Sequence, residues 1–408
     1  MNEEALDTIQ PSAFGRRKIV PRALIVDDKP HVRQFMCDCL EELHFIASGC
    51  AVPGELELAL DTLLPDLVLV GTRSGDPQGR DMLMLLAMRK FAGQVLLFGT
   101  ATAPLTDALH ELGTTLGLDM LPVLPAPFND ASLRNAVAAF IPHELPPHPA
   151  IDVREALAIG YLELCYQPRI DAETLRLSGA EALMRLRHPS WGIMPPAGFK
   201  PADGGVHAGA LCEFILARLC EDWHYFAAEH CPVEIAVNLQ MPLVLHLAAL
   251  DSLARLLPEH PAFDGLIVEL NADAVVHDLA EAKSIARRLR AHNIGLSIAG
   301  LGEEWPLLVG QNDFPFVEIQ CDRQFVCGCA GERLKRYVCR QIFELADGFG
   351  ARAVAQGVET QDDFHAVREI GFDHIQGPLF AKPMTAQKFA REAQRRSRLL
   401  PPLRDALD

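Results

Sequence analysis

The sequence lacks the features of a membrane or secreted protein. No stretch approaches the ~18 consecutive apolar residues that a membrane-spanning helix needs. Residues 1–19 open with acidic side chains and contain no apolar signal core, which favours a flexible leader over a secretion signal. We therefore expect no membrane insertion and a cytoplasmic location.

Basic residues are also few. The 408 residues include 37 Lys and Arg against 54 Asp and Glu, which gives a formal net charge of -17. A chain this acidic repels the phosphate backbone of DNA or RNA. The charge balance therefore argues against a nucleic-acid partner.

Paired cysteines are missing as well. The 11 cysteines are an odd number and include no CxxC pair. Neither a disulfide framework nor a zinc site is indicated by such spacing. We interpret the loose group Cys321, Cys327, Cys329 and Cys339 as free thiols, the form that a reducing cytosol maintains.

What the first part of the sequence does contain is an alternation of strands and helices. Apolar runs at residues 22–28, 65–71, 94–100 and 120–128 have the pattern of buried strands, and segments with helical spacing lie between them. Strands that alternate with helices predict an α/β fold with a doubly wound parallel sheet.

A second domain is predicted after a proline-rich stretch. Four prolines within residues 142–152 indicate a stiff linker. Beyond it the alternation resumes, and about eight strands fit a TIM-type (β/α)8 barrel. The strand candidates are residues 161–171, 178–188, 234–240, 266–271, 295–300, 316–322, 351–358 and 374–380.

Polar side chains stand at or near the ends of these strands. In such a barrel the functional residues lie at the carboxyl ends of the strands. Oxygen-bearing side chains that converge on one rim indicate a hard-cation or phosphate-ester site, although each one alone also suits a cap or a turn. The candidates are Glu181, Asn238, Glu269, Asp322, Glu359 and Gln376.

The opening of the second domain carries a more specific signature. Its motifs are Gln167-Pro168, Gly179 to Leu183, Arg185 and Arg187-His188-Pro189, followed in order by AVNL, VEL, DRQFV, GVET and QGPLFAKPM. This part of the chain resembles the EAL domain, the phosphodiesterase domain that hydrolyses cyclic di-GMP. The resemblance implies an EAL domain at 151–398, with a tail at 399–408. It also implies a homodimer and a setting in bacterial motility or biofilm control.

The first domain resembles a response-regulator receiver domain. The segment LIVDD ends in Asp27 and Asp28, which match the magnesium-binding acids of receivers, and Thr100 in LLFGTATA matches the switch threonine. The short APF segment matches the end of the lysine–proline turn. The resemblance spans residues 20–143, with the linker at 144–150.

Two receiver positions lack the side chains that phosphorylation requires. The resemblance places the phosphoryl-accepting aspartate at Gly71 and the family lysine at Ala126. Phosphotransfer needs a nucleophilic carboxylate and neutralisation of the transferred group. We therefore expect a receiver that is not phosphorylated, although Asp27 and Asp28 could still bind a cation.

The EAL resemblance also implies missing catalytic groups. Active members use a consecutive aspartate pair to help hold two metals, a lysine to support the attacking water, a glutamate as general base and another glutamate to steady a loop. In the same order, these positions are Ala299 and Gly300, Gln320, Gln356 and Ala272. Two-metal hydrolysis needs anionic ligands for both cations, and glutamine cannot deprotonate water at neutral pH. We expect no catalytic residue and no required cofactor, with at most one weakly bound Mg²⁺ or Mn²⁺. The residual metal candidates are Glu181, Asn238, Glu269 and Asp322.

Residues that would recognise the nucleotide are retained. The planar guanidinium of Arg185 suits a phosphate oxyanion. Three hypotheses stay open: an inactive signalling protein that acts through protein partners, which we favour, a cyclic di-GMP receptor without hydrolysis, and a weak phosphodiesterase. The ligand-binding candidates are Gln167, Glu181, Leu183, Arg185, Asn238, Glu359 and Gln376.

Overall fold

The computed structural model forms two compact units. The first lies within residues 1–150 and 186–198, and the second within 151–185 and 199–408. The expected leader, the linker at 144–150 and the tail beyond Leu399 lie outside the described residues. The structure describes residues 20–51, 53–73, 78–100, 102–128, 130–141, 153–188, 192–194, 208–241, 244–245, 257–311 and 313–399.

The N-terminal unit is built on a parallel sheet. Its strand order is β2-β1-β3-β4-β5, with β6 paired to β4, and each of these pairings is parallel. The strands are β1 (Arg22–Val26), β2 (Ile46–Cys50), β3 (Leu67–Thr72), β4 (Gln94–Gly99), β5 (Asp119–Met120) and β6 (Leu124–Pro125). The helices are α1 (Pro30–Glu42), α2 (Pro53–Leu63), α3 (Gln78–Met88), α4 (Ala103–Thr115), α5 (Asp130–Ala136) and the short η1 (Ala138–Phe140).

Helices cover both faces of this sheet, because successive residues of a strand point to opposite sides. Ile25 of β1 packs with Met36 of α1 and Leu133 of α5. The preceding Leu24 belongs to a separate cluster formed with α2, α3 and α4. The predicted parallel sheet with helices is thus present.

Two elements of this unit escape prediction from the sequence. Strand β2 reads IASGC, and its central residues Ser48 and Gly49 are exposed because β2 lies at the edge of the sheet. Helix α2 follows it and packs Leu56 and Leu60 into the core. The single strand expected at 120–128 is instead the two short strands β5 and β6.

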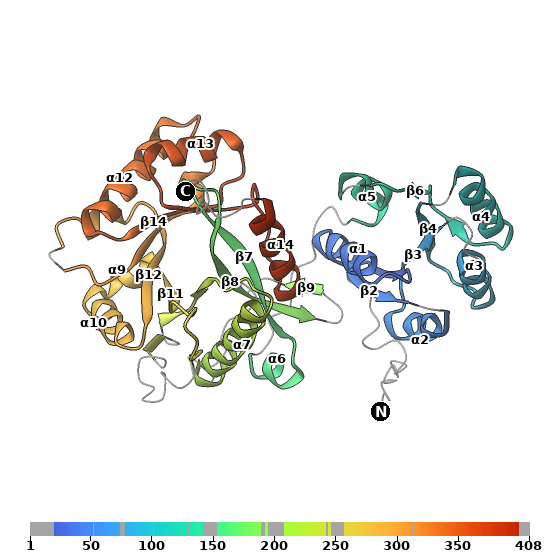
Figure 1. Ribbon diagram of the computed structural model, residues 1–408, viewed down its shortest axis with the longest axis horizontal. Coiled ribbons are helices and arrows are strands. Elements are labelled where there is room, and N and C mark those ends of the chain that lie inside the picture. The colour runs from blue at the N-terminus through green and yellow to red at the C-terminus, as the bar shows by residue number, and fades with distance from the viewer. Residues whose placement is uncertain are drawn as a thin grey trace, which may run out of the picture. The chain divides into compact units, whose positions relative to one another are not determined.

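The C-terminal unit is an α/β barrel. The sheet order is β16-β7-β15-β14-β13-β12-β11-β10-β8-β9, and pairing of β7 with β8 closes the ring. In Figure 1 the helices α7, α10, α12 and α13 lie around these strands. The strands of this sheet are β7 (Leu162–Asp171), β8 (Leu177–His188), β9 (Gly192–Met194), β10 (Glu234–Asn238), β11 (Leu266–Asn271), β12 (Ile294–Leu301), β13 (Glu318–Cys321), β14 (Arg352–Gln356), β15 (His374–Gln376) and β16 (Met384–Thr385). Of these, β9 and the last residues of β8, from Leu186 on, fall within the range of the first unit. The helices are α6 (Val153–Ile159), α7 (Ala208–Ala228), α9 (Ala272–His277), α10 (Leu279–Arg290), η4 (Trp305–Leu308), α11 (Arg323–Val326), α12 (Arg333–Phe349), α13 (Gln361–Ile370) and α14 (Ala386–Leu399).

One strand departs from the predicted all-parallel TIM-type barrel. Strand β7 runs antiparallel to its neighbour β15, whereas the pairings from β8 through β15 are parallel. Only the turn at residues 172–176 separates β7 from β8. A parallel connection needs a crossover of a dozen or more residues, so this short turn reverses the chain.

No helix in the described part of the chain is both long and apolar enough to cross a membrane.

Candidate functional site

A buried arginine lies at the centre of the barrel. Arg169 of β7 is 2% exposed, and its guanidinium forms a close ion pair with Glu269 of β11. Its Nη1 lies 3.1 Å from Glu318 Oε1 of β13, and its Nε donates to Gln376 Oε1 of β15 at 3.1 Å. Strand β7 is not a neighbour of β11 or β13 in the sheet. These contacts therefore cross the barrel interior.

Glu318 is the most fully satisfied acid of this cluster. It accepts from Ser297 Oγ at 3.0 Å and from Gln320 Nε2 at 3.0 Å, and its other oxygen lies 3.5 Å from Arg352 Nη2. Burial opposes its ionisation, but Arg169 and Arg352 hold the pKa of Glu318 below its ordinary value. Glu318 is therefore an anion under ordinary conditions.

Glu269 behaves differently although it contacts the same arginine. Burial and the nearby Glu181 raise the pKa of Glu269 above its ordinary value, against the opposing effect of Arg169. Arg169 is therefore the group that favours the ionised form of Glu269 inside the barrel. Glu269 Oε2 and Gln320 Oε1 have no hydrogen-bond partner among the described residues.

Three of the ligand-binding candidates are joined by hydrogen bonds from the side-chain amide of one of them, Gln376. Gln376 Nε2 donates to Gln167 Oε1 at 3.1 Å and forms a close hydrogen bond with Glu181 Oε2. Gln167 Nε2 donates to the carbonyl of Ala381 at 2.9 Å. The sequence therefore predicted side chains that do lie together, and they are buried and bonded to one another.

The remaining candidates are more scattered. Asn238 ends β10 and is exposed, whereas Leu183 on β8 is half-buried. Asp322 caps α11 and accepts from the Gln324 N–H at 2.7 Å, which is the ordinary role of an acid before a helix. Glu359 forms a close ion pair with the exposed Arg323.

Arg185 differs from the other ligand-binding candidates because it carries a positive charge. Its Nη1 donates to the Met184 carbonyl at 2.9 Å. Burial lowers the pKa of Arg185, against the opposing effect of nearby carboxylates, Glu181 and Glu163. A half-buried guanidinium is suited to an anionic ligand.

The positions at which the family resemblance implies catalytic groups lie on barrel strands or directly after them. Ala299 on β12 and Gln320 on β13 are buried, Gln356 ends β14, and Ala272 opens α9. Gly300 has φ +68°, and a Cβ there would lie 3.3 Å from Asp322 Oδ2. A side chain at this position would therefore begin close to the Asp322 carboxylate, but glycine has no side-chain oxygen to offer a metal ion.

These residues do not fit a pair of divalent cations. Ala299 and Gly300 supply no oxygen ligand, and Glu269 is bonded to Arg169. Within the part of the chain that the structure describes, no group of three or more His, Cys, Asp and Glu is placed to hold a metal ion. Two-metal sites need several anionic ligands around cations a few ångströms apart.

The acidic pair of the N-terminal unit also contacts an arginine. Arg73, just after β3, has its Nη2 3.6 Å from Asp27 Oδ1 and forms a close ion pair with Asp28. A Cβ at Gly71 would lie only 2.1 Å from Asp27 Oδ2. The Asp27 carboxylate therefore fills the space in which a residue-71 side chain would begin.

The other two receiver candidates are fixed by backbone bonds. The Thr100 N–H donates to the Thr72 carbonyl at 3.1 Å, and Ala126 N–H donates to the Gly99 carbonyl at 2.8 Å. Thr100 is exposed and Ala126 is half-buried. Thr100 directly follows β4 and Ala126 directly follows β6, and neither side chain carries a charge.

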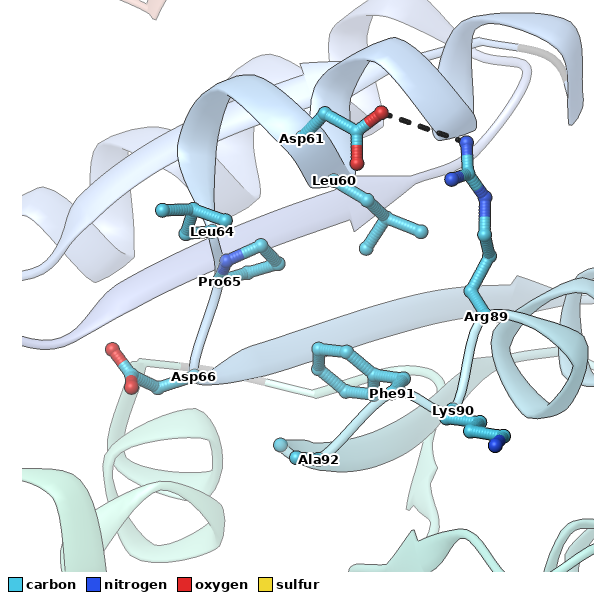
Figure 2. A pocket seen from close by; sticks show the side chains of 10 residues that line it. Leu60, Asp61, Leu64, Pro65, Asp66, Arg89, Lys90, Phe91 and Ala92 are labelled. Carbon is cyan, nitrogen blue, oxygen red and sulfur yellow. Dashed lines mark ion pairs between the residues drawn. The ribbon is translucent and has the colours of Figure 1, made fainter. Parts of the chain in front are cut away.

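A pocket of about 410 Å³ lies at the opposite end of the same sheet. Figure 2 shows Leu60 and Phe91 in its lining and Arg89 turned toward Asp61, 3.6 Å away. It sits where β3 and β4 begin, whereas ligands of doubly wound sheets bind beyond the carboxyl ends of the strands. The pocket is therefore separate from the acidic pair.

The 11 cysteines form no disulfide. Cys321 Sγ lies 3.8 Å from Cys339 Sγ, and Cys329 is buried nearby. The contact with Cys321 and burial raise the pKa of Cys339, so its thiol stays protonated.

The fold, the motif order and the barrel site converge on one family. The EAL domain model matches residues 151–383, more than half of the chain, and the chain belongs to the EAL domain family. Among curated relatives, it is 30% identical over 236 residues to the cyclic di-GMP phosphodiesterase PA2567 of Pseudomonas aeruginosa, covering 57% of this chain and 40% of that protein. It is 29% identical over 240 residues to the bifunctional diguanylate cyclase/cyclic di-GMP phosphodiesterase MucR of the same species, covering 58% and 35%. The chain thus spans less than half the length of these relatives.

Solved structures support the fold of the same region. The EAL enzyme Bd1971, in its cAMP- and cyclic di-GMP-bound form, aligns with a TM-score of 0.51 at 16% identity, over 71% of this chain and 74% of that chain. The FimX EAL domain of Xanthomonas citri in complex with cyclic di-GMP aligns with a TM-score of 0.50 at 18% identity, over 57% and 92%. At these identities the likeness establishes the fold alone.

Three residues of the barrel cluster are not predicted as site residues from the sequence. Arg169, Ser297 and Glu318 were not among the candidates. A usable signal exists, because residues two apart on a strand face the same side. Arg169 follows Gln167 by two, and Glu318 precedes Gln320 by two.

Proposed function

We propose that this chain is a catalytically inactive EAL-type protein that acts through protein partners in bacterial cyclic di-GMP signalling. One observation carries the proposal: Glu269, an expected metal ligand, is ion-paired to Arg169. The neighbouring Ala299 and Gly300 offer no replacement ligand. No required metal or other cofactor is part of this proposal.

The loss of a general base supports the same proposal. The resemblance places that base at Gln356, whose amide cannot accept a proton from water at neutral pH. Loss of general-base catalysis typically costs about 10² to 10⁴ in rate. A protein that lacks both the base and the metal ligands should hydrolyse cyclic di-GMP at a negligible rate.

The test is hydrolysis by the purified full chain. Cyclic di-GMP is incubated with the protein and Mg²⁺ or Mn²⁺, with the phosphodiesterase PA2567 as a positive control in the same buffer. We expect linear dinucleotide at least about 10²-fold below that control. Formation at a comparable rate would establish an active phosphodiesterase and end the proposal.

A second candidate function, a cyclic di-GMP receptor, is favoured by Arg185. Its half-buried guanidinium donates to a main-chain carbonyl, that of Met184. Calorimetry with cyclic di-GMP separates this function from the first. Binding that weakens about tenfold or more in Arg185→Ala, the loss expected for a charge-assisted hydrogen bond, would identify a receptor. Absence of binding favours the protein-partner function.

For the N-terminal unit we propose a receiver-like domain at 20–143 that is not phosphorylated, joined by the linker at 144–150 to the EAL domain at 151–398. Its strand order is the one found in flavodoxin-like doubly wound sheets. Gly71 has no nucleophile, and the Asp27 carboxylate stands where its side chain would start. A phosphodonor such as acetyl phosphate should therefore leave the mass of the protein unchanged. A mass increase of one phosphoryl group that is lost in Asp27→Asn would contradict this.

A further inference from the structure

The barrel interior holds more buried acids than buried bases. Glu181, Glu269 and Glu318 are each at most 4% exposed, and Arg169 is the buried arginine of the described barrel residues. Buried carboxylates need a cation or hydrogen-bond donors, since water no longer solvates them. The question is which cation this barrel uses.

Each of the three guanidinium nitrogens of Arg169 contacts its own acceptor side chain. Nε donates to Gln376 at 3.1 Å, Nη1 donates to Glu318 at 3.1 Å, and Nη2 pairs with Glu269. One side chain thereby connects four strands of the ring, namely β7, β11, β13 and β15. A guanidinium presents donors in a rigid planar fork, which suits several acceptors in fixed directions.

We infer that the Arg169 guanidinium is the cation that stabilises the interior of the EAL barrel. It holds Glu269, Glu318 and Gln376 together in place of a divalent metal ion. This inference rests on the proposed function, because it assigns Glu269 to an arginine and not to a metal. A covalently attached cation cannot be removed by a chelator. The barrel should therefore be equally stable with and without divalent ions.

The experiment is thermal unfolding of the full chain in EDTA and in excess MnCl₂. A metal that binds only the folded state raises the melting temperature, whereas an ion that does not bind leaves it unchanged. For the wild type we expect a difference below about 1 °C. A rise of several degrees in MnCl₂ would overturn the inference, because the interior would then accept the divalent ion with Arg169 in place.

Two substitutions locate the effect in the cluster. Arg169→Met should lower the melting temperature by about 10 °C, because it leaves buried carboxylates without their cation. The matched control is Arg336→Met, which removes an exposed pair with Glu369 in the same unit and should cost about 2 °C or less. Equal effects of the two substitutions would also overturn the inference.

A double-mutant cycle covers the case in which Arg169→Met does not fold. Glu269→Gln removes the unpaired charge, so the double variant Arg169→Met/Glu269→Gln should melt higher than Arg169→Met alone or fold where that variant does not. A double variant that melts lower than Arg169→Met would contradict the pairing. If neither variant folds, the wild-type response to MnCl₂ decides.

The two proposals fail in different assays. Linear dinucleotide formed by the wild type would end the proposed function. Metal-dependent melting of the wild type without any hydrolysis would end only the assignment of Arg169.

Discussion

An arginine contacts two acids in each unit, but the two sites differ in their contact with water. In the N-terminal unit Arg73 bridges Asp27 and Asp28, and the Arg73 and Asp28 side chains are 30% and 40% exposed, whereas that of Asp27 is 7% exposed. In the barrel, Arg169 and its partners Glu269 and Glu318 are 2% exposed or less. Solvent weakens exposed ion pairs, whereas a buried charge that loses its partner is strongly unfavourable. The arginine–carboxylate ion pairs should therefore contribute little to the stability of the first unit and much to the stability of the second.

The largest effect is expected for Glu318→Gln. This substitution replaces the buried anion between Arg169 and Arg352 by a neutral amide, and it should cost about 3 kcal/mol of unfolding free energy. The measurement is urea denaturation followed by circular dichroism. Glu234→Gln is the matched control, because Glu234 also pairs with Arg352 but is partly exposed. A similar loss in both variants would show that burial does not distinguish the two acids.

An intermediate effect is expected where a buried acid is held by neutral hydrogen-bond donors. Asp363 is 2% exposed and accepts from the N–H groups of Gly328 and Ala330 and from the Thr360 hydroxyl. Asp363→Asn leaves one of these donors facing an amide nitrogen, so it should cost about 1 to 3 kcal/mol.

The pH dependence of that loss gives a further check. Burial opposes ionisation, but these donors lower the pKa of Asp363 below its ordinary value of 3.8. A depressed folded-state pKa means that the stabilisation is complete above 3.8 and is lost as the pH falls below it. The stability difference between the wild type and Asp363→Asn should shrink in that range. A difference that grows with acidification would contradict the prediction.

The smallest effect is expected for Arg73→Met. Because its pairs are partly exposed, the substitution should change the unfolding free energy by less than about 1 kcal/mol, and added salt should remove the difference. Urea denaturation at low and high NaCl measures both quantities. A loss as large as that of Glu318→Gln would erase the contrast between the two units.

The strands that the sequence predicts best are those that are buried along their whole length. Strand β11 coincides with the predicted residues 266–271 because four of its six residues are apolar and all but Asn271 are buried. Strand β2 was missed because an edge strand with exposed Ser48 and Gly49 has little apolar signal. The reversal of β7 was missed because periodicity indicates a strand without its direction, although the short turn at 172–176 held that information.

The candidate site was predictable only in part, for a related reason. Gln167, Glu181 and Gln376 belong to recognisable motifs, and they do meet. Arg169 was missed because a charged residue in a strand usually indicates a solvated position. Its partners Glu269 and Glu318 lie 100 and 149 residues away along the chain, so only the closed ring brings them together.

The most direct test of the central claim is a crystal structure of the protein grown with MnCl₂ and cyclic di-GMP, examined by anomalous scattering. We predict no manganese peak between Glu181 and Glu269, with the Arg169 guanidinium against Glu269 and Glu318. Two manganese peaks at the barrel mouth, with Glu269 turned toward them and away from Arg169, would contradict the account.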